Sequence, residues 1–178
     1  MIDDRIRIPL SKRKLILALL GSLLLVVGGF WMVSNPERFQ SKVFSNHTFI
    51  FLTGMLSITF FGTCGFYISK KLADPRPGLI IDGTGITDNT SGISAGFIPW
   101  SDIKEFKTAQ VINQKFIMVI VYNPENYIER QTNSAKRNAV TINYKGYGSP
   151  VSISANALKC NFSELEGFFK QNLKRTNQ

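Results

Sequence analysis

Two long uncharged stretches dominate the pattern of hydrophobic and polar positions. Residues 15–33 and residues 49–68 contain no Asp, Glu, Lys or Arg. At about 1.5 Å per helical residue, each stretch reaches roughly 28–30 Å, the thickness of the hydrocarbon core of a bilayer. The alternative for the first stretch is a signal peptide, but its apolar run is longer than the usual 7–15 or so residues and no small-x-small cleavage site follows. The pattern predicts two transmembrane helices, 15–33 and 49–68, joined by an external loop, 34–48.

Small residues gather on one face of each predicted helix. They are Ala18, Gly21, Ser22, Gly28 and Gly29 in the first helix, and Gly54, Ser57 and Gly65 in the second. Small faces allow helix backbones to approach closely, so these residues predict the seam of an antiparallel helix pair. The alternative is that glycine is simply common in membrane spans.

From Gly78 onward, short alternating segments replace the long apolar stretches. They end at clusters of turn residues such as Asp82-Gly83-Thr84-Gly85, which is typical of strands joined by tight turns. The predicted strands are 79–81, 86–88, 93–100, 103–111, 116–122, 140–144 and 151–154. Short strands linked mostly by turns favour an antiparallel β core over a parallel sheet.

Two other segments indicate helices. Asn123-Pro124-Glu125 is a favourable helix start and predicts one or two short surface helices within residues 123–138. Near the end of the chain, Ser163 and Glu166 match a capping box. An apolar stripe at helical spacing follows and predicts a terminal helix that packs on the β core: Leu165, Phe168, Phe169 and Leu173.

Positive charge is concentrated beside the two apolar stretches. The chain has 21 Lys+Arg against 12 Asp+Glu, and six of its nine net charges lie in segments 1–14, 34–48 and 69–77. A nucleic-acid-binding protein would instead carry a basic face on its folded domain, so we expect no nucleic-acid partner. The loop holds only Arg38 and Lys42, so the positive-inside rule predicts that both termini are cytoplasmic. The basic residues predicted to flank the membrane are Arg13, Lys14, Lys70, Lys71 and Arg76.

Residues with catalytic or metal-binding chemistry are few. Cys64 and Cys160 fall in different predicted compartments, so both should be free thiols, and Cys160 has no cytoplasmic histidine to act as its base. The Asp-Gly-Thr-Gly segment at Asp82 resembles loops of phosphoryl-transfer enzymes and aspartic proteases, but the spacing fits neither, and a hairpin turn explains its glycines. The sequence therefore predicts no enzyme activity, no metal site and no cofactor.

Residues 79–86 and 98–103 resemble the opening of bacterial pleckstrin-homology-like (PH-like) domains. The residues that carry the resemblance are Asp82, Gly83, Gly85, Pro99, Trp100 and Asp102. Two spans followed by such a domain resemble a family of small uncharacterised bacterial membrane proteins. The resemblance implies a PH-like antiparallel β-barrel or sandwich capped by the C-terminal helix, and it implies no activity. Within it we expect Trp100 in the core and Asp102 capping a turn by accepting backbone amide hydrogen bonds.

The prediction as a whole is an α+β membrane protein. Residues 1–14 form a basic cytoplasmic N-terminus, 15–68 the helical hairpin, 69–78 a linker, and 79–178 a PH-like domain that should be soluble when started near Gly78. The turn that follows the first strand of that domain lacks the Lys and Arg with which eukaryotic PH domains bind phosphoinositides, which argues against such binding.

The predicted partners are therefore the lipid bilayer and either another protein or a second copy of the chain. The predicted function is a non-catalytic binding or scaffolding module anchored in a bacterial inner membrane. The alternative is an accessory subunit of a membrane enzyme or transporter.

Overall fold

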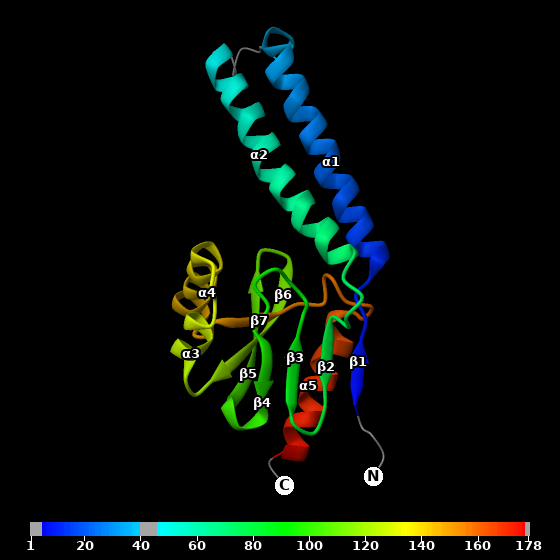
Figure 1. The fold of residues 1–178 in the computed structure, drawn as a ribbon, viewed down its shortest axis with the longest axis vertical. Helices are drawn as coiled ribbons and strands as arrows, with labels where there is room; N and C mark the ends of the chain where they lie inside the picture. The colour runs from blue at the N-terminus through cyan, green and yellow to red at the C-terminus, as the bar shows by residue number, and fades with distance from the viewer. Residues whose placement is uncertain (1–4, 40–45, 177–178) are drawn as a thin grey trace. The chain divides into compact units, whose positions relative to one another are not determined.

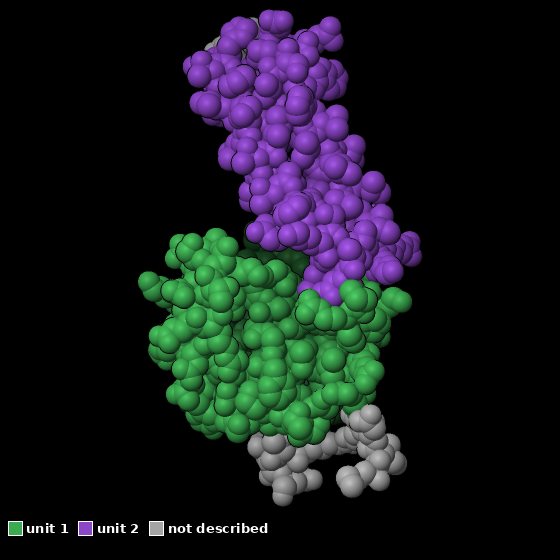
Figure 2. All heavy atoms as spheres, viewed as in Figure 1, with its two compact units in different colours: residues 1–11, 75–178 green, residues 12–74 purple. Residues whose placement is uncertain are grey.

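The computed structural model describes residues 5–39 and 46–176, and of residues 173–176 it describes the backbone alone (Figure 1). The chain forms two compact units, which Figure 2 colours separately. Unit 1 consists of residues 1–11 and 75–178, and unit 2 consists of residues 12–74. Unit 2 is thus inserted into the chain of unit 1. The predicted N-terminal segment 1–14 is divided between the two units.

Unit 2 is a hairpin of two long helices. Helix α1 covers Lys12–Ser34, helix α2 covers His47–Leu72, and the short 3-10 helix η1, Pro36–Phe39, lies between them. Both long helices extend beyond the predicted apolar stretches because their flanking lysines and arginines are themselves good helix formers. Each helix is long and apolar enough, by length and composition, to cross a membrane.

Small residues bring the backbones of α1 and α2 together. The contacts occur at three levels, Gly29 with Gly54, Leu25 with Ser57, and Ser22 with Gly65. A Cβ atom added to Gly29 would lie 2.9 Å from the carbonyl oxygen of Gly54, and the Ser57 hydroxyl donates to the Leu25 carbonyl at 2.9 Å. The antiparallel seam is confirmed for these residues. The predicted seam is wrong for three others that point away from it: Ala18, Gly21 and Gly28.

Unit 1 contains two antiparallel sheets. The first has the order β1-β2-β3-β4, with strands Ile6–Ile8, Leu79–Ile81, Gly85–Asp88 and Gly96–Pro99. The second has the order β5-β6-β7, with strands Ile103–Val111, Gln114–Val121 and Val151–Ile153. The helices are η2 (Trp100–Asp102), α3 (Pro124–Glu129), α4 (Ser134–Tyr147) and α5 (Phe162–Thr176). The α+β class is confirmed, and the described strands form two open sheets, not a closed barrel.

Strand β1 was missed by the sequence analysis. It pairs with β2 in antiparallel register, with Ile8 opposite Leu79, and the Gly78 amide donates to the Ile8 carbonyl at 2.9 Å. Only Ile6 and Ile8 carry its alternating pattern, and the charges around them suggested a membrane flank. A fragment that starts near Gly78 therefore lacks one strand of the first sheet.

The predicted strand 140–144 is wrong, because these residues lie within α4. The Asn133 side chain caps this helix by accepting from the Ala135 amide at 2.9 Å, and Gly148, with φ of 74°, ends it. Val140 and Tyr144 are four residues apart, so the pattern that fits a strand also places two apolar groups on one helix face. The predicted helical segment 123–138 is confirmed as α3 and the start of α4.

Helix α5 packs on the core, as predicted. Leu165 and Phe169 are buried there beside strand residues such as Ile81 and Val119. The helix starts earlier than Ser163, because the capping box is formed by two other residues. The Glu164 amide donates to the Asn161 side chain at 2.9 Å, and the Asn161 amide donates to the Glu164 carboxylate at 2.8 Å. The predicted Leu173 side chain lies outside the described residues.

Candidate functional site

Four residues of the PH-like resemblance meet where the β2–β3 turn contacts the end of β4: Asp82, Gly85, Pro99 and Trp100. The indole Nε1 of Trp100 donates to the carbonyl of Asp82 at 2.8 Å, and the Trp100 amide donates to the Thr84 carbonyl at 3.3 Å. Gly85 lies opposite Pro99, and a Cβ atom added to Gly85 would overlap the carbonyl of Ile98. Trp100 is half-buried against the core, so the predicted core position is only partly right. Gly83 faces open space.

The Asp82 carboxylate is committed to this turn. It accepts from the Thr84 hydroxyl at 2.6 Å and the Thr84 amide at 3.0 Å, and it forms an ion pair with Arg5 at 3.1 Å. The Thr84 hydroxyl and, to a smaller extent, Arg5 hold the pKa of Asp82 below its ordinary value despite partial burial. These contacts give Asp82 a structural role and join the segment before α1 to the β2–β3 turn.

Asp102 binds a different partner from the one predicted. Its carboxylate accepts from the hydroxyl of buried Tyr127 at 2.7 Å, in place of the expected backbone amide. Burial, with a contribution from this hydrogen bond, raises the pKa of Tyr127. The Arg130 guanidinium lies 4.5 Å from the Tyr127 ring and donates to the Phe97 carbonyl at 3.2 Å. Asp102 therefore ties α3 to the end of β4, and the predicted amide cap is wrong.

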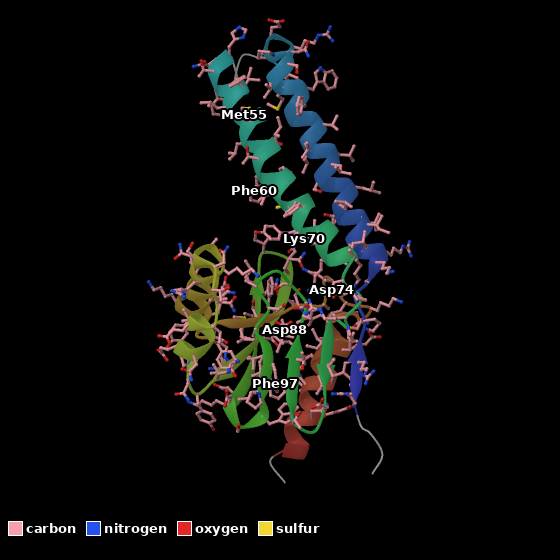
Figure 3. The ribbon with its side chains drawn as sticks, in the orientation of Figure 1. Met55, Phe60, Lys70, Asp74, Asp88 and Phe97 are labelled. Carbon is pink, nitrogen blue, oxygen red and sulfur yellow. The ribbon has the colours of Figure 1, made fainter. Side chains whose placement is uncertain are left out.

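A second turn aspartate, Asp88, was not singled out from the sequence. It is 3% exposed, and its carboxylate accepts from the Thr90 amide at 2.9 Å, the Thr90 hydroxyl at 2.7 Å and the Ala95 amide at 3.0 Å (labelled in Figure 3). Burial raises its pKa. The spacing Asp-x-Thr at Asp82 and again at Asp88 was the signal that could have identified both turns.

Both ends of the inserted hairpin enter unit 1 at the same end, which we call the junction end. There the Ser11 amide donates to the Ala157 carbonyl at 2.8 Å, and Leu10 forms an isolated bridge with Leu158. On the other connection, the Asn89 amide donates to the Gly78 carbonyl at 2.8 Å. The hairpin is thus joined to unit 1 through two hydrogen-bonded segments rather than one linker.

The predicted membrane-flanking residues lie on both sides of this connection. Arg13 and Lys14 are exposed at the start of α1, and Lys70 and Lys71 lie near the end of α2, so the antiparallel hairpin brings all four to one end of unit 2. The Lys70 ammonium lies 4.5 Å from the Phe66 ring. Arg76 is exposed in unit 1.

The outer surfaces of α1 and α2 are strongly apolar. Met55 is 43% exposed and Phe60 59% exposed on α2, where Figure 3 labels them, and Leu24 is 73% exposed on α1. The other large exposed hydrophobic side chains of the hairpin are Ile16, Leu17, Leu20, Leu23, Leu25, Val27, Phe30, Trp31, Phe49, Phe51, Leu52, Leu56, Phe66 and Tyr67. An apolar surface this extensive marks a contact with a membrane or a partner.

Residues with reactive chemistry are sparse in the part of the chain that the structure describes. Cys64 and Cys160 are not joined in a disulfide. Residues 5–39 and 46–176 contain no group of three or more His, Cys, Asp or Glu able to hold a metal ion.

Comparison of the chain with known protein families, curated proteins and solved structures found no match. Function is therefore inferred from the geometry of the two units.

Proposed function

We propose that the protein is a membrane-anchored, non-catalytic binding module, with α1 and α2 spanning a bacterial inner membrane and unit 1 in the cytoplasm. The observation that carries this proposal is the insertion of one apolar hairpin between two segments of one folded unit. A hairpin of two spans returns the chain to the side it left, and β1 and β2 must meet on that side in order to pair. The outward apolar side chains of α1 and α2 then face lipid.

Charge supports the cytoplasmic orientation. Arg13, Lys14, Lys70 and Lys71 lie at the end of the hairpin that leads into unit 1, whereas the connecting segment holds Arg38 and Lys42. Loops rich in Lys and Arg are retained in the cytoplasm. We call the ends of α1 and α2 that carry these four residues the stems of the hairpin. Each basic group close to an anionic leaflet contributes about 1 kcal/mol of attraction, so the stems also hold unit 1 near the membrane.

The architecture of unit 1 supports a PH-like binding module. It combines antiparallel sheets of four and three strands with a C-terminal helix that packs on the core. Its three turn aspartates, Asp82, Asp88 and Asp102, are each bonded to a neighbouring Thr or Tyr, which favours structural roles over catalysis. On this basis we assign the module to binding or scaffolding rather than to chemistry.

Because β1 is the first strand of the sheet, the 82–85 turn is not the first turn of unit 1, the turn at which eukaryotic PH domains bind lipid headgroups. The turn 82–85 joins the second and third strands, so it is not the connection between the first two. That connection is the hairpin itself, with basic residues on both stems. The lack of Lys and Arg at 82–85 therefore no longer counts against headgroup binding. We propose the stems as the lipid-binding part of the protein.

We propose that a protein partner or a second copy of the chain covers the exposed apolar side chains of unit 1. Phe97 is 47% exposed on β4, where Figure 3 labels it, and Tyr122 is 62% exposed after β6. On α4, Ile142 is 66% and Tyr147 40% exposed.

Purification in mild detergent tests the class of partner. Monomers or self-oligomers support the module, whereas a fixed stoichiometric partner supports an accessory subunit.

Alkaline carbonate extraction tests the anchor. The wild-type chain should remain in the membrane fraction. Leu24→Arg combined with Leu56→Arg, at two lipid-facing positions of the hairpin, should release a large share of it, since an arginine at the centre of a span costs about 3 kcal/mol or more. Tyr147→Arg, at an exposed position of unit 1, is the matched control and should leave retention unchanged. Release of the wild-type chain would contradict the proposal.

A further inference from the structure

The β5–β6 hairpin ends in a two-residue turn with an unusual residue, Ile112. Its φ is 55°, and it is the one non-glycine position with positive φ among residues 5–39 and 46–176. A β-branched side chain rarely adopts this conformation, and a turn of this kind normally takes Asn or Gly. The Ile112 side chain is 88% exposed, more than any other large hydrophobic side chain in the described segments. It therefore adds neither packing nor an easy backbone conformation to unit 1.

This turn lies at the junction end of unit 1. Gln114, the first residue after the turn, accepts from the Asn156 side chain at 2.5 Å. The neighbouring Ala157 carbonyl accepts from the amide of Ser11, the last residue before α1. In Figure 1 the β5–β6 turn lies at the same end of unit 1 as the β3–β4 loop, whose first residue, Asn89, is bonded to Gly78. Short chains of contacts inside unit 1 thus connect Ile112 to the place where the hairpin leaves.

Basic side chains accompany the apolar tip. Lys115 is exposed next to Gln114, with its ammonium 5.8 Å from the ring of Phe162. Lys159 is exposed on the segment that follows Asn156, and its amide donates to the Pro9 carbonyl at 3.0 Å. An apolar side chain flanked by lysines suits the interface of an anionic leaflet, where the side chain enters and the ammonium groups stay at the headgroups.

We propose that the Ile112-Asn113 turn inserts into the headgroup region of the leaflet that α1 and α2 enter, giving unit 1 a third attachment to the membrane. This inference rests on the proposed function. A bilayer is the occupant favoured over a protein pocket, because the apolar part of α1 begins at Leu15, four residues or about 6 Å of helix rise after Ser11. The bilayer is therefore the large surface nearest the junction end. Insertion explains why an exposed isoleucine occupies a position suited to asparagine.

Site-specific fluorescence in reconstituted vesicles tests the proposal. The full chain, with Cys64→Ala and Cys160→Ser, carries a single cysteine labelled with an environment-sensitive fluorophore, in vesicles of three parts phosphatidylcholine to one part phosphatidylglycerol. With the label at Ile112→Cys, we expect a blue-shifted emission that lipids spin-labelled near the headgroup quench by about half or more. Tyr122→Cys is the matched control. It is exposed at the opposite end of β6, roughly 27 Å away along the strand, and lipids spin-labelled near the headgroup should not quench its emission.

A third label, at Leu24→Cys in the middle of α1, is read with lipids spin-labelled deep in the acyl chain, and it separates this inference from the proposed function. Quenching at position 24 without quenching at position 112 overturns the inference and leaves the membrane anchor intact. No quenching at position 24 overturns the anchor itself. Equal quenching at positions 112 and 122 also overturns the inference, because unit 1 would then lie flat on the membrane.

Thermal unfolding of the full chain in detergent gives a second readout. Ile112→Asn should raise the unfolding temperature of unit 1 by a few degrees, because asparagine tolerates positive φ. A clear drop would show that Ile112 serves the fold, which contradicts the proposal.

Discussion

Ile8 on β1 tests how the N-terminal segment is joined to unit 1. Its side chain is 5% exposed and belongs to the core cluster, and its backbone pairs with Leu79 across the sheet. Ile8→Ala removes three carbon atoms from the core, which at about 0.8 kcal/mol each is about 2.4 kcal/mol before any cavity is counted. Large-to-small substitutions of this type cost about 2–5 kcal/mol in total. The free energy of unfolding of unit 1 should therefore fall by at least about 2 kcal/mol.

The matched control is Arg7→Ala on the same strand. Arg7 is exposed and its side chain lies on the opposite face, so its removal should change the free energy of unfolding by less than about 0.5 kcal/mol. Denaturant unfolding of the full chain in detergent, followed by Trp100 fluorescence in a Trp31→Phe background, reports on unit 1 alone, because the chain has 2 tryptophans. Equal unfolding curves for Ile8→Ala and Arg7→Ala would show that β1 is not part of the folded unit.

Four further outcomes are expected. Asp88→Ala should lower the free energy of unfolding by about 2–4 kcal/mol in the same assay, because two buried donors and one partly buried donor lose their acceptor; a loss below about 0.5 kcal/mol would contradict its role. The folded-state pKa of Asp82 is lowered, so its carboxylate stabilises unit 1 above about pH 4 and the stabilisation is lost as the pH falls through the folded value; the stability difference between wild type and Asp82→Asn, measured from pH 7 to pH 3, should shrink and not grow. Trp100→Phe should cost about 1 kcal/mol by removing the indole hydrogen bond; because it also removes the fluorescent reporter, it is measured by thermal unfolding in detergent, and an unchanged stability would show that this bond is unimportant. Gly29→Ala should destabilise the helical hairpin by about 1–3 kcal/mol in detergent, whereas Gly28→Ala, which faces open space, should not; equal effects would contradict the seam.

The two long helices and most strands could be predicted because their signals are local. An uncharged stretch such as 15–33 needs no tertiary contact to be recognised, and the glycines and aspartates around 82–85 mark where a strand must end. The strand at 140–144 was mistaken because five alternating residues suit a strand and a helix face equally. The helix forms because the Asn133 side chain, seven residues before Val140, caps its first turn.

Strand β1 and the junction end could not be predicted, because both depend on contacts between distant parts of the chain. The segment Ile6–Ile8 is short, and its partner β2 follows some seventy residues later, after the whole hairpin. The same limit explains the turn aspartates. The sequence cannot show that a tyrosine hydroxyl, not a backbone amide, reaches Asp102, and the exposure of Ile112 emerges only once the β5–β6 register is known.

A corrected fragment of unit 1 follows from the position of β1. A chain in which Ser11 is joined to Pro75 by a short Gly-Ser linker keeps β1 beside β2, and it should be soluble and fold cooperatively. A fragment starting near Gly78 exposes the edge of β2 and loses Ile8 from the core, so it should aggregate or unfold at a lower denaturant concentration.

The topology of the hairpin tests the central claim most directly. A reporter enzyme that is active only outside the cytoplasm is fused after Gln178 in one chain and inserted between Arg38 and Phe39, in the segment joining α1 to α2, in another. With both chains expressed at equal levels, the reporter should be silent at the C-terminus and active in the connecting segment. An active C-terminal reporter with a silent one in the connecting segment would place unit 1 outside the cytoplasm, and silence at both positions would show that the hairpin does not span the membrane.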